Sequence, residues 1–365
     1  MKIAFYSPLK SPNHPVPSGD RLMARLLIAA LGRAGHVVDV ASELRTFLAG
    51  PEEDGRAAID AASVAEIERI DRLWRTGGAP DVWFCYHPYY KAPDLIGPEL
   101  ARRFPIAYVT AEASYSQRRN RGLWSENQRL LAETVRHAAV NLCFTRRDRD
   151  GLAQSIPGGR FRLLRPFIDP SAYLAVEPVP QAGRIVTVAM MRPGDKFESY
   201  RMLAAALARL PEGLPWTLSI IGDGALRSAV EALFWPLPGE RILWHGQCGP
   251  AEIAQILSRS SVYAWPGTGE AYGLAYLEAQ AAGLPVVAQR VAGVPEVVCD
   301  GVTGMLTPAG DVEAYAASLV QILTDGEERR RMALAARRFV TDECSIEGAA
   351  LRLGEILSED VGGRR

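Results

Sequence analysis

The chain alternates short apolar runs with longer segments in which apolar residues recur every three or four positions. The first apolar run spans residues 2–6, a helical pattern follows from Leu22 to Leu31, and a second run spans residues 36–41. Short apolar runs predict buried strands, and a strand–helix–strand order predicts a parallel sheet. Further strands are predicted at 81–86, 106–110 and 140–144. The first half of the chain is therefore predicted to be a doubly wound α/β domain.

The same alternation starts again after a proline-rich segment. Residues 166–183 contain Pro166, Pro170, Pro178 and Pro180, a density that neither a helix nor a central strand tolerates. Beyond it, strands are predicted at 184–190, 216–221, 241–246, 261–265 and 285–289, and a last amphipathic helix at 345–358. We predict two Rossmann-like domains, at residues 1–175 and 176–343, followed by a helix and tail at 344–365.

Length and charge narrow the classes of function. A chain of 365 residues is long enough for two cores, so a cleft between two domains is the expected place for a site. The formal net charge of -1 removes the electrostatic argument for a nucleic-acid partner. The five cysteines are odd in number and have no metal-ligand spacing, and the apolar N-terminal run is too short for a signal peptide. We expect a cytoplasmic protein with reduced thiols.

Two cations follow the strand predicted at 184–190. Arg192 and Lys196 lie four residues apart on a tight turn beside a helix start. The arginine offers a planar fork of donors and the lysine a mobile point charge, a pair suited to a diphosphate. Taken alone, the two residues are also consistent with a solvated charged loop.

Two glutamates, Glu270 and Glu278, lie in and after the glycine-rich loop that follows the strand predicted at 261–265. Eight residues of continuous helix would rotate Glu278 by about 80° from Glu270, so Glu270 is expected in the loop. If the helix begins near Tyr272, the N–H groups of residues 272–275 form an anion site. Glu278, roughly 7–8 Å further along the axis, would then hold the hydroxyls of a ribose, and Glu270 those of a sugar beyond the phosphates. A surface position for Glu278 and helix capping by Glu270 are the alternatives. The combination predicts a nucleotide diphospho-sugar ligand.

The segment GEAYGLAYLEAQAAGLPVVAQRVAGVPEVVCDGVTGML, residues 269–306, closely resembles the Glu-x7-Glu signature of the retaining glycosyltransferases of family 4 (glycosyl transferases group 1). The resemblance extends to residues 220–233 and 244–267 and to the Arg192/Lys196 pair, and more loosely to residues 31–42. It implies the GT-B fold, an α/β arrangement of two Rossmann-like domains with a cleft between them. The C-terminal helix is expected to return to the N-terminal domain.

The resemblance also implies roles for individual residues. Arg192 and Lys196 would stabilise the departing diphosphate, Glu278 would hold the ribose, and Gly19 of the first domain would approach the phosphates. Glu270 would hold the donor sugar together with the backbone of Ala271, Tyr272, Gly273 and Leu274. In addition, Gln247 and Cys248 lie on a loop that could approach the nucleotide base.

Two positions depart from the family pattern. Many members carry a histidine after the strand that corresponds to residues 106–110, where this chain has Ala111 and Glu112, and Glu112 could substitute for it. The first-domain loop has Ser18, Gly19 and Asp20 in place of the common pair of glycines. Either change could alter the sugar that is accepted or signal a loss of activity.

The acceptor is expected on the first domain. His87 and Tyr89 follow one strand, and Glu112 and Tyr115 follow the next. Aromatic rings with a polar edge suit the faces of sugars, although packing between domains and a structural histidine explain the same residues. Arginines at 118, 119 and 121 are compatible with peripheral contact at the inner face of a membrane, or with a solvated surface.

Together these observations predict transfer of a sugar from a UDP-, GDP- or ADP-sugar to a sugar, lipid-linked or small-molecule acceptor, with retention of configuration and with neither metal nor cofactor. The alternative is a non-catalytic GT-B protein that binds a nucleotide-sugar or a partner. Asp148-Arg149-Asp150 resembles a metal-binding pair, but acids in the first turn of a helix explain it better. Gly222-Asp223-Gly224 lacks the third glycine of a dinucleotide fingerprint, which argues against an oxidoreductase.

Overall fold

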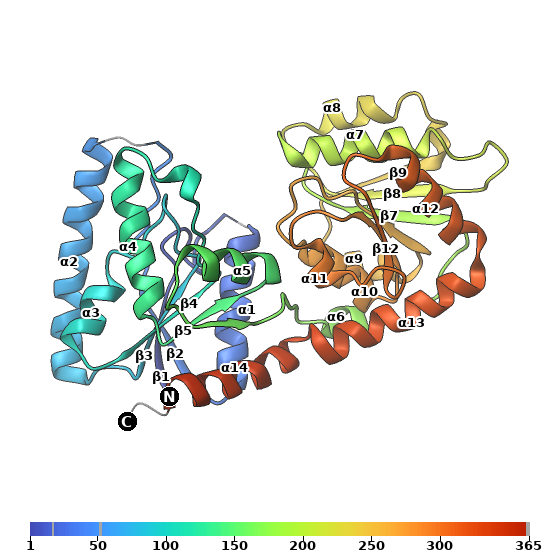
Figure 1. Cartoon of the computed structure of the whole chain (residues 1–365). Coiled ribbons are helices and arrows are strands. Elements are labelled where there is room, and N and C mark those ends of the chain that lie inside the picture. The colour runs from blue at the N-terminus through green and yellow to red at the C-terminus, as the bar shows by residue number, and fades with distance from the viewer. Residues whose placement is uncertain (17, 51–52, 363–365) are drawn as a thin grey trace. The chain divides into compact units, whose positions relative to one another are not determined.

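The structure of the protein is a computed structural model that describes residues 1–16, 18–50 and 53–362. The end of the predicted tail, residues 363–365, lies outside this description. The chain forms two compact units, of which unit 1 comprises Met1–Arg165 with Ile346–Arg365, and unit 2 comprises Pro166–Ser345. Each unit is a parallel sheet between layers of helices (Figure 1).

The sheet of unit 1 has six parallel strands in the order β2-β1-β3-β4-β5-β6. Its strands are β1 (Lys2–Tyr6), β2 (Val37–Ser42), β3 (Val82–Tyr86), β4 (Ala107–Ala111), β5 (Val140–Cys143) and β6 (Phe161–Leu163). Its helices are α1 (Gly19–Arg33), α2 (Glu53–Gly77), α3 (Gly97–Arg103), the 3-10 turn η1 (Gln117–Arg119), α4 (Leu123–His137), α5 (Arg146–Ser155) and α14 (Ile346–Asp360). Helices α2, α3 and α4 cover one face of the sheet, and α1 and α14 the other (Figure 1).

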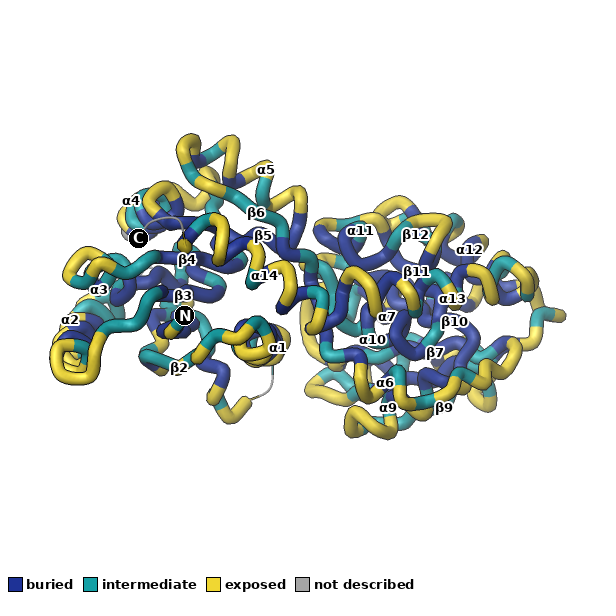
Figure 2. The backbone as a smooth tube through the Cα atoms, turned by 90° about the horizontal axis from the view of Figure 1, so that it is seen from below, coloured by how far each residue is buried: buried dark blue, intermediate teal, exposed yellow. Residues whose placement is uncertain are grey.

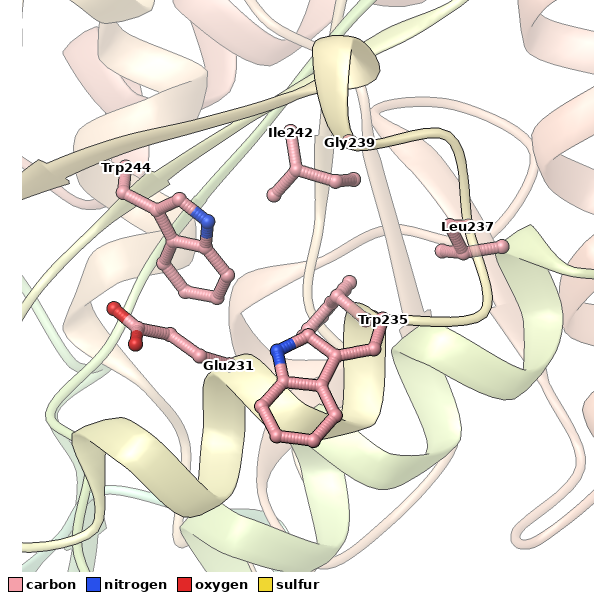
Figure 3. Close-up of a pocket in the computed structure, with 7 residues that line it drawn as sticks. Glu231, Trp235, Leu237, Gly239, Ile242 and Trp244 are labelled. Carbon is pink, nitrogen blue, oxygen red and sulfur yellow. The ribbon is translucent and has the colours of Figure 1, made fainter.

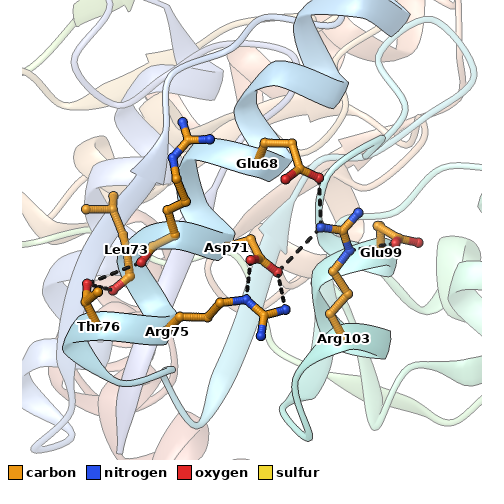
Figure 4. A network of polar contacts seen from close by, with 8 residues as sticks. Glu68, Asp71, Leu73, Arg75, Thr76, Glu99 and Arg103 are labelled. Atoms are coloured by element: carbon orange, nitrogen blue, oxygen red, sulfur yellow. Dashed lines mark hydrogen bonds and ion pairs between the residues drawn. The ribbon is translucent and has the colours of Figure 1, made fainter.

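A buried carboxylate organises the core under α3. Asp94 accepts hydrogen bonds of 2.8 Å from Trp83 Nε1 and from the Tyr108 hydroxyl, and its other oxygen accepts from the backbone N–H groups that start α3. Because every polar atom in this group has a partner, the carboxylate can be buried at little cost. On the outside, Arg103 of α3 reaches both Glu68 of α2, at 2.9 Å, and Glu99 on its own helix (Figure 4).

The sheet of unit 2 also has six parallel strands, in the order β12-β11-β10-β7-β8-β9. Its strands are β7 (Arg184–Val188), β8 (Thr217–Ile221), β9 (Ile242–Gly246), β10 (Val262–Ala264), β11 (Val286–Gln289) and β12 (Gly304–Thr307). Its helices are α6 (Ser171–Leu174), α7 (Asp195–Leu207), α8 (Arg227–Phe234), the 3-10 turn η2 (Gly239–Arg241), α9 (Pro250–Ser258), α10 (Leu274–Ala281), α11 (Val294–Val297), α12 (Val312–Thr324) and α13 (Gly326–Glu343).

The helices of unit 2 form two layers. Helices α7, α8 and α12 lie on one face of the sheet, and α6, α9 and α10 on the other (Figure 1). Figure 2 shows the central strands of both units as largely buried, whereas the edge strands β2, β6 and β9 are partly exposed and the helices present exposed outer faces. All of the strands that the sequence predicts are present, and β6 and β12 are additional.

The ends of unit 2 differ from the predicted domain limits. Residues 166–175, predicted to close the first domain, lie in unit 2. The Ile168 N–H donates to the Cys344 carbonyl at 3.0 Å, and α6 packs against α9 and α10. These contacts fasten the segment to other elements of unit 2, so the unit begins at Pro166.

Helix α14 belongs to unit 1, where it packs along α1. Leu353, Ile356 and Leu357 form its buried face. At its end, Arg162 of unit 1 donates to Asp360 at 2.9 Å. None of the helices described is long and apolar enough to cross a membrane.

Candidate functional site

Loops that follow the carboxyl ends of parallel strands are the usual ligand-binding elements of doubly wound sheets. In unit 2, β7 and β10 are neighbouring strands, so the loop after each of them leaves the same edge of the sheet side by side. These loops carry Arg192 and Glu270, and they lead into α7 and α10. The residues predicted to hold a diphospho-sugar therefore belong largely to one edge of unit 2.

The loop after β7 is held by the loop after β8. The Met191 N–H donates to the Asp223 carbonyl at 2.9 Å, and the Leu226 N–H donates to the Met191 carbonyl at 3.0 Å. Gly222 has a φ of 141°, and a Cβ atom added there would lie 1.9 Å from the Ala189 carbonyl oxygen. Glycine is therefore required for the two loops to approach, which explains the Gly222-Asp223-Gly224 sequence without a dinucleotide.

Lys196 and Glu270 are in direct contact. The Lys196 ammonium forms an ion pair with the Glu270 carboxylate, and it lies 5.4 Å from the centre of the Trp265 ring. The two side chains are 23% and 19% exposed, so they are reachable from solvent but partly desolvated. Arg192 is exposed and forms neither a hydrogen bond nor an ion pair with any residue that the structure describes. At this end of the sheet, Lys196 is therefore a paired cation and Arg192 an unpaired one among the residues described.

The loop that carries Glu270 is fastened on both sides. The Thr268 N–H donates to Ser199 Oγ of α7 at 2.9 Å, and the Gly293 N–H donates to the Ala271 carbonyl at 2.7 Å. Gly269 has a φ of +64°, and an added Cβ atom would lie 2.1 Å from the Asp195 carboxylate. These contacts fix Glu270 toward the start of α7, where Lys196 lies.

Helix α10 begins at Leu274, two residues later than the predicted start at Tyr272. Its N-cap is Gly273, with a φ of 78°, and no side chain caps the helix. The first N–H groups of an α-helix have no partner within the helix, so this end is suited to an anion. Of the four residues predicted to contribute backbone groups, Leu274 lies in the helix, while Ala271, Tyr272 and Gly273 precede it.

Glu278 lies in the second turn of α10, apart from the Lys196–Glu270 pair. It is partly exposed, and a hydrogen bond joins it to the Tyr173 side chain of α6. Burial raises the pKa of Glu278, and the bond to Tyr173 partly opposes this. No sequence pattern indicates Tyr173, because the contact depends on the packing of α6 against α10.

The residues predicted to contact the nucleotide base also follow the carboxyl end of a strand of unit 2. Gln247 and Cys248 follow β9, the edge strand, which is separated from β10 by β7 and β8. Gln247 is exposed. The Cys248 thiol lies 3.8 Å from the His245 carbonyl oxygen, and burial, followed by the neighbouring Glu252, raises its pKa.

In unit 1, the departure at Asp20 has a structural role. Gly19 is the exposed first residue of α1, and an added Cβ atom would meet nothing within 4 Å. Ser18 caps the helix by accepting from the Arg21 N–H at 3.2 Å. The Asp20 carboxylate lies 3.1 Å from His87 Nδ1, which follows β3. The residue that replaces the expected glycine thus holds a predicted acceptor residue.

His87 and Glu112 have an unusual backbone. Their φ angles are 59° and 57°, in the left-handed region that costs an ordinary residue about 1–2 kcal/mol. Both follow neighbouring strands, and the His87 N–H donates to the Ala111 carbonyl at 2.8 Å. The ends of β3 and β4 therefore bring together two of the residues predicted to meet an acceptor.

The charges of this group shift one another's pKa values. Burial lowers the pKa of His87, but the hydrogen bond to Asp20 and the charges of Glu112, Asp20 and Asp148 raise it overall. The hydrogen bond to His87 is the largest influence on Asp20, whose pKa is lowered. Burial raises the pKa of Glu112, against the opposing effect of His87. The shifts of His87 and Asp20 favour an ion pair between these two side chains. The raised pKa of Glu112 means that this neighbouring carboxyl is protonated more readily than an ordinary glutamate.

Aromatic rings extend from this group. The rings of His87 and Tyr89 lie 5.4 Å apart, and those of Tyr89 and Tyr90 5.5 Å apart. Burial, with the charges of Tyr90 and Asp20, raises the pKa of Tyr89 to about 12, so its hydroxyl stays protonated. Tyr115, the remaining predicted acceptor residue, instead packs against the apolar cluster between α4 and α5.

The helix-start interpretation of Asp148 is confirmed. Its N–H donates to Thr145 Oγ1 at 3.0 Å, and the Thr145 hydroxyl donates back to its carboxylate at 2.7 Å. This reciprocal arrangement caps α5. Among the residues described, no group of three or more histidines, cysteines or acids is arranged to hold a metal ion.

One pocket lies away from all of these residues. It measures about 460 Å³ and is lined by the end of α8 and by β9, including Glu231, Trp235 and Trp244 (Figure 3). Trp235 is 79% exposed. None of the predicted site residues lines this pocket.

Comparison with known proteins bears on the family and the fold of the chain. The sequence family described as Glycosyl transferases group 1 matches residues 182–325, which contain Arg192, Lys196, Glu270 and Glu278. Among solved structures, sucrose-phosphate synthase from Thermosynechococcus elongatus has a TM-score of 0.77 at 22% identity, covering 99% of both chains. Anabaena HepE in complex with UDP-glucose has a TM-score of 0.69 at 17% identity, covering 98% of this chain and 100% of that one. The fold is that of the GT-B proteins, with two Rossmann-like units.

Sequence relatives lead to the same class. Sulfoquinovosyl transferase from Arabidopsis thaliana is 34% identical over 38% of this chain and 27% of its own length. D-inositol 3-phosphate glycosyltransferase from Corynebacterium efficiens is 31% identical over 64% of this chain and 55% of its own length. The chain thus spans about half or less of these relatives. The predicted resemblance to the glycosyl transferases group 1 is confirmed over residues 182–325 of unit 2.

Proposed function

We propose that this protein transfers a sugar from a nucleotide diphospho-sugar to an acceptor hydroxyl, with retention of configuration and without a metal ion. The observation that carries the proposal is the contact between Lys196 and Glu270 beside the uncapped start of α10, with the unpaired Arg192 on the adjacent loop. Cations and helix N–H groups together stabilise the charge that appears on a departing diphosphate. A relative from Mycolicibacterium smegmatis, 33% identical over 45% of this chain, is named as a GDP-mannose-dependent mannosyltransferase, which supports a donor of this class.

In the proposed reaction, the bond between the sugar C1 and the β-phosphate oxygen breaks, and a bond from C1 to the acceptor oxygen forms on the same face. The acceptor proton passes to the departing phosphate oxygen. Arg192 and Lys196 neutralise the charge that develops there, and Glu270 accepts hydrogen bonds from the donor sugar. Glu278 accepts hydrogen bonds from the ribose hydroxyls, with Tyr173 fixing its orientation.

The acceptor would be held by the edge of unit 1 that carries Asp20, His87 and Glu112. Tyr89 would offer a ring and a protonated hydroxyl to a sugar acceptor.

The experiment is a mass-spectrometric search for donor hydrolysis and transfer across UDP-, GDP- and ADP-sugars. Arg192→Ala should lower turnover by about 100-fold, the typical effect of removing one group that stabilises transition-state charge. Arg201→Ala, on an exposed arginine of α7 paired with Glu198, is the matched control and should leave turnover unchanged. A donor that binds without turnover would favour the non-catalytic alternative. Neither binding nor turnover of any donor would contradict the proposal.

A further inference from the structure

Several acidic side chains lie near His87, at the carboxyl ends of the strands of unit 1. Asp20 of α1, Glu112 after β4 and Asp148 of α5 all act on the charge of His87. Of these three, Asp20 is in direct contact with the imidazole, at 3.1 Å from Nδ1. Two cations oppose these acids: the charge of Lys10 contributes to lowering the pKa of Asp20, and that of Arg45 lowers the pKa of Tyr89. A ligand that reaches His87 would therefore meet the carboxyl groups of Asp20 and Glu112.

This group is accessible from solvent on one side. The His87 side chain is 23% exposed and that of Asp20 is 36% exposed, although Asp20 already occupies His87 Nδ1. The other ring nitrogen, Nε2, is then the polar atom of His87 that remains to meet a ligand. The backbone places His87 and Glu112 on adjacent strand ends in left-handed conformations, which hold both side chains at this edge.

A buried hydroxyl without a partner directly follows β1, the strand beside β3. Ser7 is 2% exposed, and its Oγ atom has no hydrogen-bond partner among the residues described. The rings of Phe5 and Phe84 stack 5.6 Å apart, so these residues share one face of the sheet. The parallel register runs as far as Tyr6 opposite Cys85, and Ser7 and Tyr86 are the next residues along the two chains.

Tyr86 connects this hydroxyl to the charged group. Its ring lies 5.7 Å from that of His87, and its side chain hydrogen-bonds to Glu112. A buried hydroxyl that has no partner in the protein is satisfied only when another polar group reaches it. Ser7 therefore points to a polar ligand at this edge, independently of the carboxylates.

We infer that Ser7, Asp20, His87 and Glu112 select the acceptor: the site takes a unit that presents hydroxyl or amino groups and rejects one that is phosphorylated or otherwise anionic at that end. Carboxylates accept hydrogen bonds from hydroxyl and ammonium groups, whereas a phosphate placed beside them is repelled. The inference rests on the proposed function, because it states which acceptors that reaction uses. It concerns unit 1 alone.

The test uses three matched probes: glucose, glucosamine and glucose 6-phosphate. Transfer from the donor that the protein hydrolyses is measured for each probe, and binding of the same probes is followed by saturation-transfer NMR. We expect glucose and glucosamine to exceed glucose 6-phosphate at least tenfold in both measurements. Equal or better use of the phosphate, or binding of none of the probes, would overturn the inference. Binding of the probes is measured separately from transfer. Failure to find any donor would therefore contradict the proposed function, while the binding measurements would still test the inference on acceptor selection.

Two variants separate recognition from folding. Glu112→Gln should reduce the preference against the phosphate about tenfold, whereas Glu133→Gln, on an exposed glutamate of α4 paired with Arg129, should not change it. Ser7→Ala removes a hydroxyl that has no protein partner, so it should weaken probe binding several-fold without lowering thermal stability. A loss of stability with unchanged binding would show that Ser7 is structural, and an unchanged preference in Glu112→Gln would contradict charge selection.

Discussion

Replacing Gly269 by alanine tests whether the Glu270 loop must be held against α7. At a φ of +64°, the new side chain costs about 1–2 kcal/mol through backbone strain alone. The added Cβ atom would also lie 2.1 Å from the Asp195 carboxylate and 3.0 Å from its Cβ, so the start of α7 or the loop must shift. Since Lys196 follows Asp195 directly, the shift should separate Lys196 from Glu270 and lower the affinity for UDP at least tenfold.

Gly301→Ala is the matched control. Gly301 also has a positive φ, of +71°, but an added Cβ atom there would meet nothing within 4 Å. Strain of about 1–2 kcal/mol corresponds to roughly 2–8 °C in the melting temperature of a unit of this size. Calorimetry should show this loss in both variants, and titration calorimetry should show weaker UDP binding only in Gly269→Ala. Unchanged UDP affinity in Gly269→Ala would refute the claim that this loop fixes the site.

Three further outcomes follow from the structure. Thr145→Ala removes the cap of α5 and should destabilise unit 1 by about 1 kcal/mol in urea unfolding, and an unchanged midpoint would refute the capping interaction. His87 has a raised pKa, so the stability it contributes is fully present below the ordinary histidine pKa of about 6.5 and is lost as the pH rises through the raised value. His87→Gln should therefore cost more stability at about pH 5.5 than at pH 9, and equal losses would contradict the Asp20 pairing. Tyr173→Phe should weaken UDP binding about tenfold through Glu278, since a hydrogen bond to a charged group is worth roughly 1.5–3 kcal/mol, and an unaltered dissociation constant would exclude this role.

The periodicity of apolar residues predicts the architecture well because both sheets are buried on two faces. Strands such as Val82–Tyr86 are wholly apolar runs that stand out from the amphipathic helices. Strand β6 was not predicted, since its three residues, Phe161–Leu163, include an arginine. Strand β12 begins with Gly304, where an added Cβ atom would lie 2.2 Å from the Val286 carbonyl oxygen. Glycine normally argues against a strand, and here it reflects close approach of two strands.

The site could be predicted only in part. The loop and helix that carry Glu270 and Glu278 are visible in the sequence because their residues are close together in the chain. The pairing of Asp20 with His87 joins residues 67 positions apart, and that of Lys196 with Glu270 joins residues 74 apart. Such pairs depend on which strands become neighbours, a property of the fold that local spacing does not contain. For this reason the sequence alone shows Asp20 only as a departure from a glycine.

The most direct measurement is a crystal structure of the protein with UDP. The account predicts that the diphosphate lies against the N–H groups at the start of α10, within reach of Arg192 and Lys196, with the ribose hydroxyls on Glu278. UDP bound elsewhere, or a diphosphate that contacts neither cation, would contradict it.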